Sequence, residues 1–297
     1  QGRKKRERPF LGHAVRNGKI RYLSAKQILQ FDDRHEGCPR KYANEYVFGR
    51  KLPRIEALTV GVSLDEAAEH YLTTGEMVLP PVLQPARRFL PEPRGPTGAL
   101  GLLCQEPLGD IVRAVALRDD FLAGRAASGV EDAIRAAATL ALRGIPFDGA
   151  ADWVHHRGTY KDKDGLLQEE PRGLVVVGIG DLKSISQIDT KVIPSGVFRG
   201  WAQTDAEVVS DPQMVIYGAA WAARHPDATH VRLEKVYAQK SSRAAAIRGG
   251  LVSRQEVLDR FGEIEDRIVS EMVEVAGAER IGDVRPALGS CDAFTHL

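Results

Sequence analysis

The sequence predicts an α/β protein in which a mostly helical N-terminal region precedes a core of strands and helices. Three observations predict this class. Hydrophobic residues recur at helical spacing through the first half, strand-like runs begin after Gly144, and helical and strand patterns then alternate. The order helices, β-arm, helix, strand, helix is typical of an α/β or α+β core with a helical N-terminal addition.

The composition is that of a globular protein able to bury a sizeable core. Of the 297 residues, 43% are hydrophobic and 27% are charged, and the net charge is +1. Such a chain makes one large domain or two small ones, and its composition argues against the membrane, collagen-like and disordered classes. It contains neither an 18-residue apolar run nor the apolar segment of a secretory signal, so we expect no membrane association and no export. The three cysteines are too few and too scattered for a disulfide scaffold, which fits a reducing cytoplasm.

Residues 1–21 are predicted to be a basic N-terminal arm. Residues 1–9 carry five Lys and Arg against one Glu, whereas the rest of the chain is mildly acidic. Such an arm could hold a phosphate backbone or an acidic partner, and it could equally be a solvated terminus.

Residues 22–145 are predicted to be a helical region. Ser24 with Gln27 reads as a capping box, and Gly75 ends a longer helix. Six prolines between residues 80 and 96 predict an extended or looped connector. The helices expected here start at Ser24 and at Pro39 and span residues 60–74, 108–122 and 130–142.

Residues 146–297 are predicted to be the core, because strand patterns appear only there. A turn-rich connection at 159–173 would join the first two strands into a long β-arm. The elements expected are strands at 151–157, 174–186 and 230–239, a helix from an Asp211-Pro212 N-cap to about residue 224, and a helix opened by Ser253 and Glu256.

Asp181-Leu182-Lys183 lies at the end of an apolar run. Because residues i and i+2 of a strand face the same side, Asp181 and Lys183 would share one surface. Charged side chains on a buried sheet are costly unless they serve one another or a metal. Two carboxylates with a lysine suit a divalent cation, since oxygen ligands hold Mg²⁺ or Mn²⁺ and an ammonium orients or helps deprotonate the attacking water. Taken alone, Asp-x-Lys also occurs by chance.

The second carboxylate depends on the strand register. If the whole of 159–173 is the connection, Asp152 faces a residue near 180 and lies beside Asp181. If the turn is centred on Lys163, Asp152 instead faces residue 174, about 20 Å from Asp181 at the rise of a strand. The register is therefore a test of the hypothesis.

Gln213 and Tyr217 are spaced i, i+4 in a predicted helix, so both would project from one face. They could hydrogen-bond a phosphate or stack a base. Alternatively, Tyr217 packs in the core and Gln213 caps the first turn.

Five motifs occur in an order and spacing that resemble the RecB-like branch of the PD-(D/E)xK nucleases. That branch includes phage and bacterial exonucleases and CRISPR-adaptation nucleases, and the resemblance spans residues 22–240. The motifs are Leu23-Ser24-Ala25 with Cys38-Pro39-Arg40-Lys41-Tyr42, the helix from Gly61 to Leu72, Gly149-Ala150-Ala151-Asp152, Gly180-Asp181-Leu182-Lys183-Ser184, and Gln213-Met214-Val215-Ile216-Tyr217.

The resemblance implies a restriction-endonuclease-like core, with a mixed central sheet flanked by helices, and metal-dependent hydrolysis of DNA phosphodiesters. It implies that Asp152, Asp181 and the Leu182 carbonyl hold Mg²⁺ or Mn²⁺. Lys183 would position the water. The nucleic-acid contacts that it implies are Gln213, Tyr217 and Ser184.

Asp65 is one departure from the family pattern, because it stands where the family usually has a metal-binding His. His70 lies five residues later, on another face of the helix. Aspartate is an oxygen ligand for Mg²⁺, so Asp65 is a candidate metal ligand and the site could survive with an altered metal preference. The site could also be weakened or dead, and Asp65 could be a surface residue.

The cysteines are a second departure. Some relatives bind an iron–sulfur cluster with four Cys, but Cys38 has only Cys291 in the final region, so no cluster is expected. We expect Cys38 to pack as a small apolar side chain.

Arg40 and Lys41 belong to a basic cluster suited to phosphate contacts. A solvated helical face would account for it nearly as well.

The sequence therefore predicts a Mg²⁺- or Mn²⁺-dependent deoxyribonuclease, expected to be an exonuclease acting in recombination, repair or phage DNA processing in the cytoplasm of a bacterial or phage-infected cell. The alternatives are a DNA-binding module with weakened or lost turnover and a nuclease subunit of a larger complex. Because no GxxxxGK[ST] motif occurs, a recombination or helicase partner would be a separate protein.

Overall fold

In a computed structural model, the chain forms two compact units, and each is described by itself. The first comprises Gln1–Leu52, Pro107–Gly149 and Glu263–Leu297, and the second Pro53–Glu106 and Ala150–Gly262. Both are discontinuous, whereas the division expected from the sequence was into three contiguous stretches. The described residues are 13–33, 37–50, 57–76, 79–93, 102–109, 111–125, 130, 133, 140–155, 158–185, 188, 202–240 and 244–287.

Helices together with sheets of mixed strand orientation make this an α/β protein, as predicted. Within the described ranges, no helix combines the length and the apolar character that crossing a bilayer requires.

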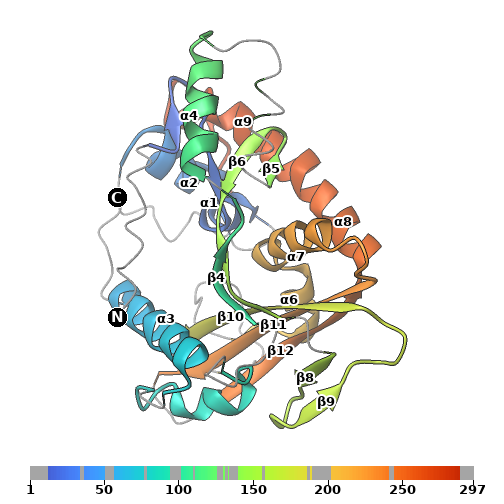
Figure 1. The fold of residues 1–297 in the computed structure, drawn as a ribbon. Helices are drawn as coiled ribbons and strands as arrows, with labels where there is room; N and C mark the ends of the chain where they lie inside the picture. Colours follow the sequence, from blue (N-terminus) through green and yellow to red (C-terminus); the bar gives the residue numbers. More distant parts are fainter. Residues whose placement is uncertain are drawn as a thin grey trace. The chain divides into compact units, whose positions relative to one another are not determined.

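The first unit combines short strands with helices (Figure 1). β6 pairs with β3 in parallel and with β5 in antiparallel orientation. Its strands are β1 (Val15–Arg16), β2 (Lys19–Ile20), β3 (Leu23–Ser24), β5 (Ala141–Leu142) and β6 (Ile145–Asp148). Its helices are α1 (Ala25–Phe31), α2 (Pro39–Tyr42), α4 (Ile111–Leu122) and α9 (Ser270–Ala276), the π-helices η2 (Ala43–Val47) and η4 (Ile264–Val269), and the 3-10 helix η5 (Ile281–Asp283).

Two tight hairpins in this unit explain differences from the sequence prediction. Asn17 and Gly18, with φ of 51° and 70°, join β1 to β2 inside the predicted basic arm, whose residues 1–12 lie outside the described residues. Arg143 and Gly144, with φ of 47° and 72°, fold β5 back onto β6. Two left-handed residues match the twist of a hairpin. The helix predicted for 130–142 is therefore wrong at its end, and most of its remainder lies outside the described residues.

The N-termini of α1 and α2 follow from local chemistry. Ser24 caps α1 as predicted, its hydroxyl accepting from the Gln27 backbone amide at 3.4 Å, but the capping box is incomplete because the Gln27 side-chain oxygen makes no hydrogen bond within the described ranges. Pro39 is the first residue of α2, where its missing N–H costs nothing. Cys38 is buried as expected, but it is disulfide-bonded rather than a free apolar side chain.

The second unit contains a five-stranded sheet in the order β12-β11-β10-β7-β4 (Figure 1). β10 and β11 are parallel, while β7 and β12 run antiparallel to their neighbours β10 and β11. The strands of this unit are β4 (Leu103–Pro107), β7 (Ala150–His155), β8 (Thr159–Lys161), β9 (Leu167–Glu169), β10 (Val176–Ile185), β11 (His230–Gln239) and β12 (Ala245–Ser253). Its helices are α3 (Ala57–Thr74), η3 (Gln84–Phe89, a 3-10 helix), α6 (Asp205–Ser210), α7 (Pro212–Arg224) and α8 (Arg254–Glu263).

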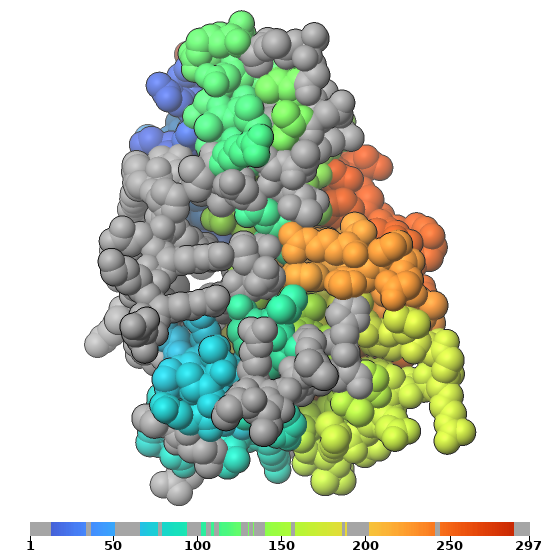
Figure 2. All heavy atoms as spheres, viewed as in Figure 1, coloured from blue at the N-terminus to red at the C-terminus, as the bar shows by residue number. Residues whose placement is uncertain are grey.

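The connection between β7 and β10 contains a small hairpin of its own. β8 and β9 pair around Gly165, whose φ is +79°. This hairpin projects from the sheet in Figure 1, and its yellow-green atoms lie at the surface in Figure 2.

The two faces of the sheet carry different partners. On one face, Val231 and Leu233 pack against α7 at Gly218, where an added Cβ would meet the Leu233 side chain at 3.0 Å. The other face forms an apolar core with α3 and η3. The sheet residues of that core are Trp153, Leu182, Val236, Ala238 and Ile247.

Two glycines of β10 let aromatic rings lie flat on this second face. A Cβ at Gly180 would meet the Trp153 ring at 1.8 Å, and one at Gly178 would meet the His155 ring at 2.2 Å. These glycines face the same two residues across the ladder. The Gly-x-Gly of β10 is therefore a packing feature of the sheet.

Candidate active site

The register of β7 on β10 brings the predicted carboxylates together. Gly178 faces His155 and Gly180 faces Trp153, so the next step of the ladder sets Asp181 opposite Asp152. The Leu182 amide donates a hydrogen bond to Oδ2 of Asp152 at 2.7 Å. This register lies one residue from the first alternative allowed by the sequence, and it excludes the alternative that separated the two acids.

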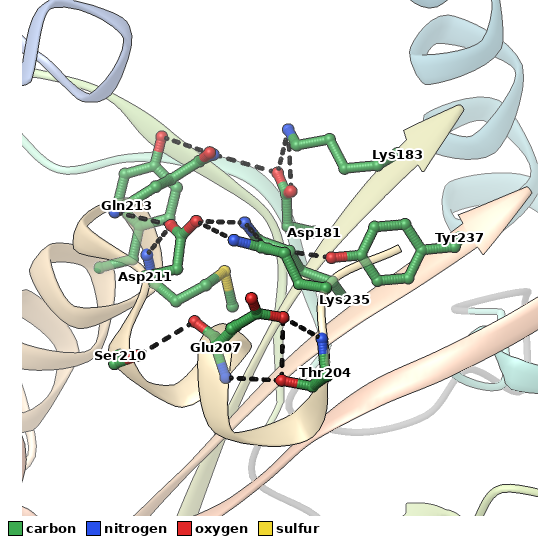
Figure 3. A network of polar contacts seen from close by, with 12 residues as sticks. Asp181, Lys183, Thr204, Glu207, Ser210, Asp211, Gln213, Lys235 and Tyr237 are labelled. Atoms are coloured by element: carbon green, nitrogen blue, oxygen red, sulfur yellow. Dashed lines mark hydrogen bonds and ion pairs between the residues drawn. The ribbon is translucent and has the colours of Figure 1, made fainter. Parts of the chain in front are cut away.

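Asp181 and Lys183 share one face of β10, as the strand period predicts. The Lys183 Nζ lies 3.0 Å from Oδ1 and 2.8 Å from Oδ2 of Asp181 (Figure 3). The Asp181 side chain is 3% exposed, whereas that of Lys183 is 42% exposed. The pair thus joins a buried acid to a lysine whose side chain is partly exposed.

α7 adds Gln213 to this pair. Asp211 caps the helix, accepting from the amides of Gln213 at 2.9 Å and Met214 at 3.3 Å, and Pro212 is its first residue. The Gln213 side-chain amide then donates to Oδ1 of Asp181 at 3.1 Å. The Asp-Pro start, which the sequence predicted, therefore fixes the residue that contacts the buried acid.

Tyr217 lies one helical turn further along α7, 3.5 Å from the Gln213 amide nitrogen. It is 5% exposed, so its ring packs in the protein interior. Burial raises the pKa of Tyr217, and the negative charge of Asp181 raises it further, so the hydroxyl keeps its proton. The structure thus joins Gln213 and Tyr217, and its placement of Tyr217 is the core packing that the sequence left as an alternative.

Opposing effects set the charge of Lys183. Burial lowers the pKa of its ammonium, but the charges of Asp181 and then Asp152 outweigh burial, and the net pKa lies above the ordinary value. Lys183 is therefore a cation, able to donate hydrogen bonds to an anionic ligand.

A second lysine–aspartate pair lies beside the first. Lys235 of β11, the ladder neighbour of Asp181, lies 2.8 Å from Oδ2 of Asp211, and both side chains are less than 5% exposed. Gln203 joins them, accepting from Lys235 at 2.9 Å and donating to Asp211 at 3.0 Å. Tyr237 donates to the same Gln203 oxygen at 3.0 Å.

Sequence reasoning missed this second pair. From the sequence, Asp211 is predicted only as a helix cap and Lys235 only as part of the strand at 230–239. The break in alternation at Glu234 and Lys235 was the available signal, because charged residues in the middle of a buried strand need partners.

The remaining predicted site residues are placed as follows. Ser184 follows Lys183 in β10, so it points to the opposite face of the sheet. Asp65 belongs to α3, but its side chain lies outside the described residues. Arg40 and Lys41 belong to α2 of the first unit, where the Arg40 guanidinium donates to the Val284 carbonyl at 3.0 Å. The Leu182 carbonyl stays a predicted ligand.

The donor set of the second unit can be compared with what a divalent cation needs. Asp181 Oδ2 is buried and, within the described ranges, makes no hydrogen bond, although the Lys183 ammonium lies nearby. No group of three His, Cys, Asp or Glu side chains suited to a metal occurs among the described residues. Mg²⁺ is commonly held by one or two carboxylates together with waters and substrate phosphates. Asp152 and Asp181 fit that mode, and the part of the chain that the structure describes forms no closed cage of protein ligands.

Comparison with known proteins leaves the site to be interpreted from its chemistry. No protein-family model matches the chain, and no curated protein matches it.

Proposed function

We propose that this chain is a metal-dependent DNA nuclease with a PD-(D/E)xK-type core, acting as an exonuclease in recombination, repair or phage DNA processing. The observation that carries the proposal is the convergence of Asp152, Asp181 and Lys183 from two adjacent strands. Two oxygen donors beside a cationic amine suit the hydrolysis of an anionic ester.

The proposed cation is Mg²⁺ or Mn²⁺, held by Asp152 and Asp181. When bound, it would supply Lewis-acid activation of water and neutralise charge on the phosphate. Oδ2 of Asp181 supports this assignment, because it is buried and, within the described ranges, its partner is the Lys183 ammonium alone, so lone-pair capacity is left there for a cation.

Lys183 would act on the substrate side of the pair. Its side chain is partly exposed and its ammonium remains charged, so it can donate to a phosphate oxygen as negative charge develops there. Gln213 is a positioning residue, since its side-chain amide donates to Oδ1 of Asp181 and so orients the carboxylate. The Tyr217 hydroxyl accepts from the Gln213 side-chain amide at 3.5 Å and so helps to hold Gln213 in place.

A digestion assay tests the proposal directly. Linear duplex and single-stranded DNA are incubated with the protein in Mn²⁺, in Mg²⁺ and in EDTA. We expect cleavage with either metal and none in EDTA, with D181A inactive at an unchanged melting temperature. The matched control is D227A, which removes a carboxylate from an exposed turn of the same unit.

Four outcomes would contradict the proposal. Cleavage that persists in EDTA, or in D181A, would remove the metal-site mechanism. Metal-independent binding of DNA without any cleavage would favour the alternative of a DNA-binding module. Activity that appears only with an added recombination or helicase protein would favour a subunit of a larger complex.

A further inference from the structure

An open groove of about 750 Å³ lies in the second unit, away from the carboxylates. It is formed by the end of α3, by η3, by the β8–β9 hairpin and by the start of β12. The inner side of η3 packs on the sheet face that carries Leu182 and Val236, opposite to the face of Asp181. The groove is therefore a separate surface and not an extension of the metal-binding side chains.

Its charged lining is mostly basic. Arg87, Arg88 and Lys161 line it against the single carboxylate of Glu92. Lys161 lies 3.2 Å from Glu92, which leaves the two arginines uncompensated. Within the described ranges, neither Arg87 nor Arg88 has a carboxylate at ion-pair distance.

The two guanidinium groups lie against aromatic rings instead of acids, and a backbone turn packs on the stem of Arg88. The Arg87 guanidinium lies 5.9 Å from the centre of the Tyr71 ring, and its Nε donates to the Tyr71 hydroxyl at 3.3 Å. Arg88 lies 4.5 Å from the centre of the Phe89 ring. The turn at Gly165 packs on the stem of Arg88, where an added Cβ would lie 3.0 Å from its Cγ.

Two other arginines of this unit have acidic partners. Arg232 is paired with Glu170, although it also lies over the Tyr160 ring, and Arg260 is paired with Glu256. Arg224 resembles Arg88, since it lies 4.5 Å from the centre of the Trp221 ring. An arginine paired with a carboxylate has most of its attraction for anions satisfied, whereas one supported by an aromatic face keeps its planar donor edge for a ligand.

We propose that this groove binds the phosphodiester backbone of a DNA strand that flanks the segment being cut. Guanidinium groups bind phosphate oxygens through paired N–H donors, and a concave surface of one sign concentrates the field on a polyanion. The open shape fits a continuous strand better than an enclosed small ligand. The choice of DNA as the polyanion rests on the proposed function.

The experiment measures binding in EDTA, so that cleavage plays no part. Anisotropy of a labelled DNA oligonucleotide is followed for the wild type and for R87E/R88E across a salt series. We expect R87E/R88E to lose at least about tenfold in affinity and its salt slope to fall by about 1.4 to 1.8, the contribution of two phosphate contacts. Both arginines are exposed, and a thermal melt checks that the variant folds.

The control variant is R172E/R280E, which reverses two exposed charges outside the groove and outside the basic arm. Unchanged affinity and slope in R87E/R88E, or an equal loss in R172E/R280E, would overturn the proposal. Displacement of the DNA by a mononucleotide at the same phosphate concentration, with equal dependence on Arg87 and Arg88, would also overturn it, because the site would then take a small phosphate ligand.

The groove and the proposed nuclease activity can fail separately. If R87E/R88E binds like the wild type while D181A abolishes metal-dependent cleavage, the groove proposal fails and the nuclease stands. If no cleavage is found but R87E/R88E loses DNA binding, the nuclease proposal fails and the groove stands.

Discussion

Two lysine–aspartate pairs lie side by side on one face of the sheet and differ in their access to solvent. In the pair of Asp181 and Lys183, the lysine side chain is 42% exposed. In the pair of Asp211 and Lys235, the lysine is 4% exposed. The ionic distances are the same, 2.8 Å in each pair. Distance between charges therefore does not distinguish them.

The hydrogen bonds of the two acids do distinguish them. Oδ2 of Asp211 accepts from Lys235 and Gln203, and its Oδ1 accepts from two amides of α7. Asp181 accepts from Lys183 and Gln213 through Oδ1, whereas its Oδ2 has the Lys183 ammonium, 2.8 Å away, as its one partner within the described ranges. The carboxylate of Asp211 is therefore saturated, whereas that of Asp181 has capacity left for a ligand at Oδ2.

One residue connects the two pairs. Gln213 gives its backbone amide to Asp211 and its side-chain amide to Asp181. The saturated pair thereby fixes the start of α7, and the start of α7 orients the unsaturated acid. We infer that the pair of Asp211 and Lys235 stabilises the fold, whereas the pair of Asp181 and Lys183 is available to a ligand. Replacing the lysine by Met should therefore act mainly on stability in the first pair and mainly on activity in the second.

Replacing Lys183 by Met should give the largest change, and the change should be in activity. We expect DNA cleavage in Mn²⁺ to fall by about 10³-fold, because a donor aimed at developing charge is lost. Stability should also fall, because Asp181 would stay buried without its cation, but by only about 1 to 3 kcal/mol, since the 42% exposed Lys183 position lets water reach the carboxylate once the lysine is gone. Initial cleavage rates and urea unfolding of the same preparation measure the two quantities.

K240M is the matched control, since Lys240 is an exposed lysine of the same unit. It should cleave at the wild-type rate. If K183M cleaves DNA at the wild-type rate, the pair of Asp181 and Lys183 does not serve catalysis, and the distinction between the two pairs fails.

Replacing Lys235 by Met should instead act on stability. Asp211 would remain buried without its cation, which costs about 3 to 5 kcal/mol when one partner of a buried pair is removed. Urea unfolding at neutral pH measures this loss. The double variant K235M/D211N should recover much of it, because Asn removes the unpaired charge and still serves as an N-cap.

If K235M unfolds at the wild-type urea concentration, the pair is not structural. If K235M/D211N is no more stable than K235M, the loss does not come from the unpaired charge of Asp211. Either result would remove the physical basis of the comparison.

The parts of this arrangement that the sequence predicted are those with local signals. Asp211 followed by Pro212 marked the start of α7 to the residue, and the apolar run before Asp181 marked β10. Residue alternation then set Asp181 and Lys183 on one face. Each of these features depends on neighbours in the chain.

The parts that it missed depend on distant residues. β12 contains Ala, Gly and Arg rather than alternating apolar residues, and it forms because β11 offers it a paired edge. β4 follows a proline-rich stretch and pairs with the edge of the sheet. Lys235 and Asp211 are 24 residues apart, and only the fold brings them together. Glu234 is another residue whose surroundings depend on the fold. It is buried on the opposite face of the sheet from Lys235, and this burial raises the pKa of its carboxyl to about 8.

The smallest expected effect is the pH dependence of the saturated pair. Burial alone would raise the pKa of Asp211, but Lys235 and the hydrogen bonds outweigh it and hold the pKa below the ordinary 3.8. The folded state therefore binds this proton more weakly than the unfolded state. The stabilisation is fully present above the ordinary pKa and is lost as pH falls through the lower, folded-state pKa.

Comparison of the wild type with D211N isolates this contribution. The difference in unfolding free energy between the two should be constant near neutral pH and should shrink as the pH is lowered toward about 2, because protonation removes the charge that Asn lacks. D227N, at an exposed turn, should show no such convergence with the wild type. A wild type to D211N difference that is independent of pH would mean that the charge of Asp211 does not stabilise the fold, and the pair would then act through its hydrogen bonds alone.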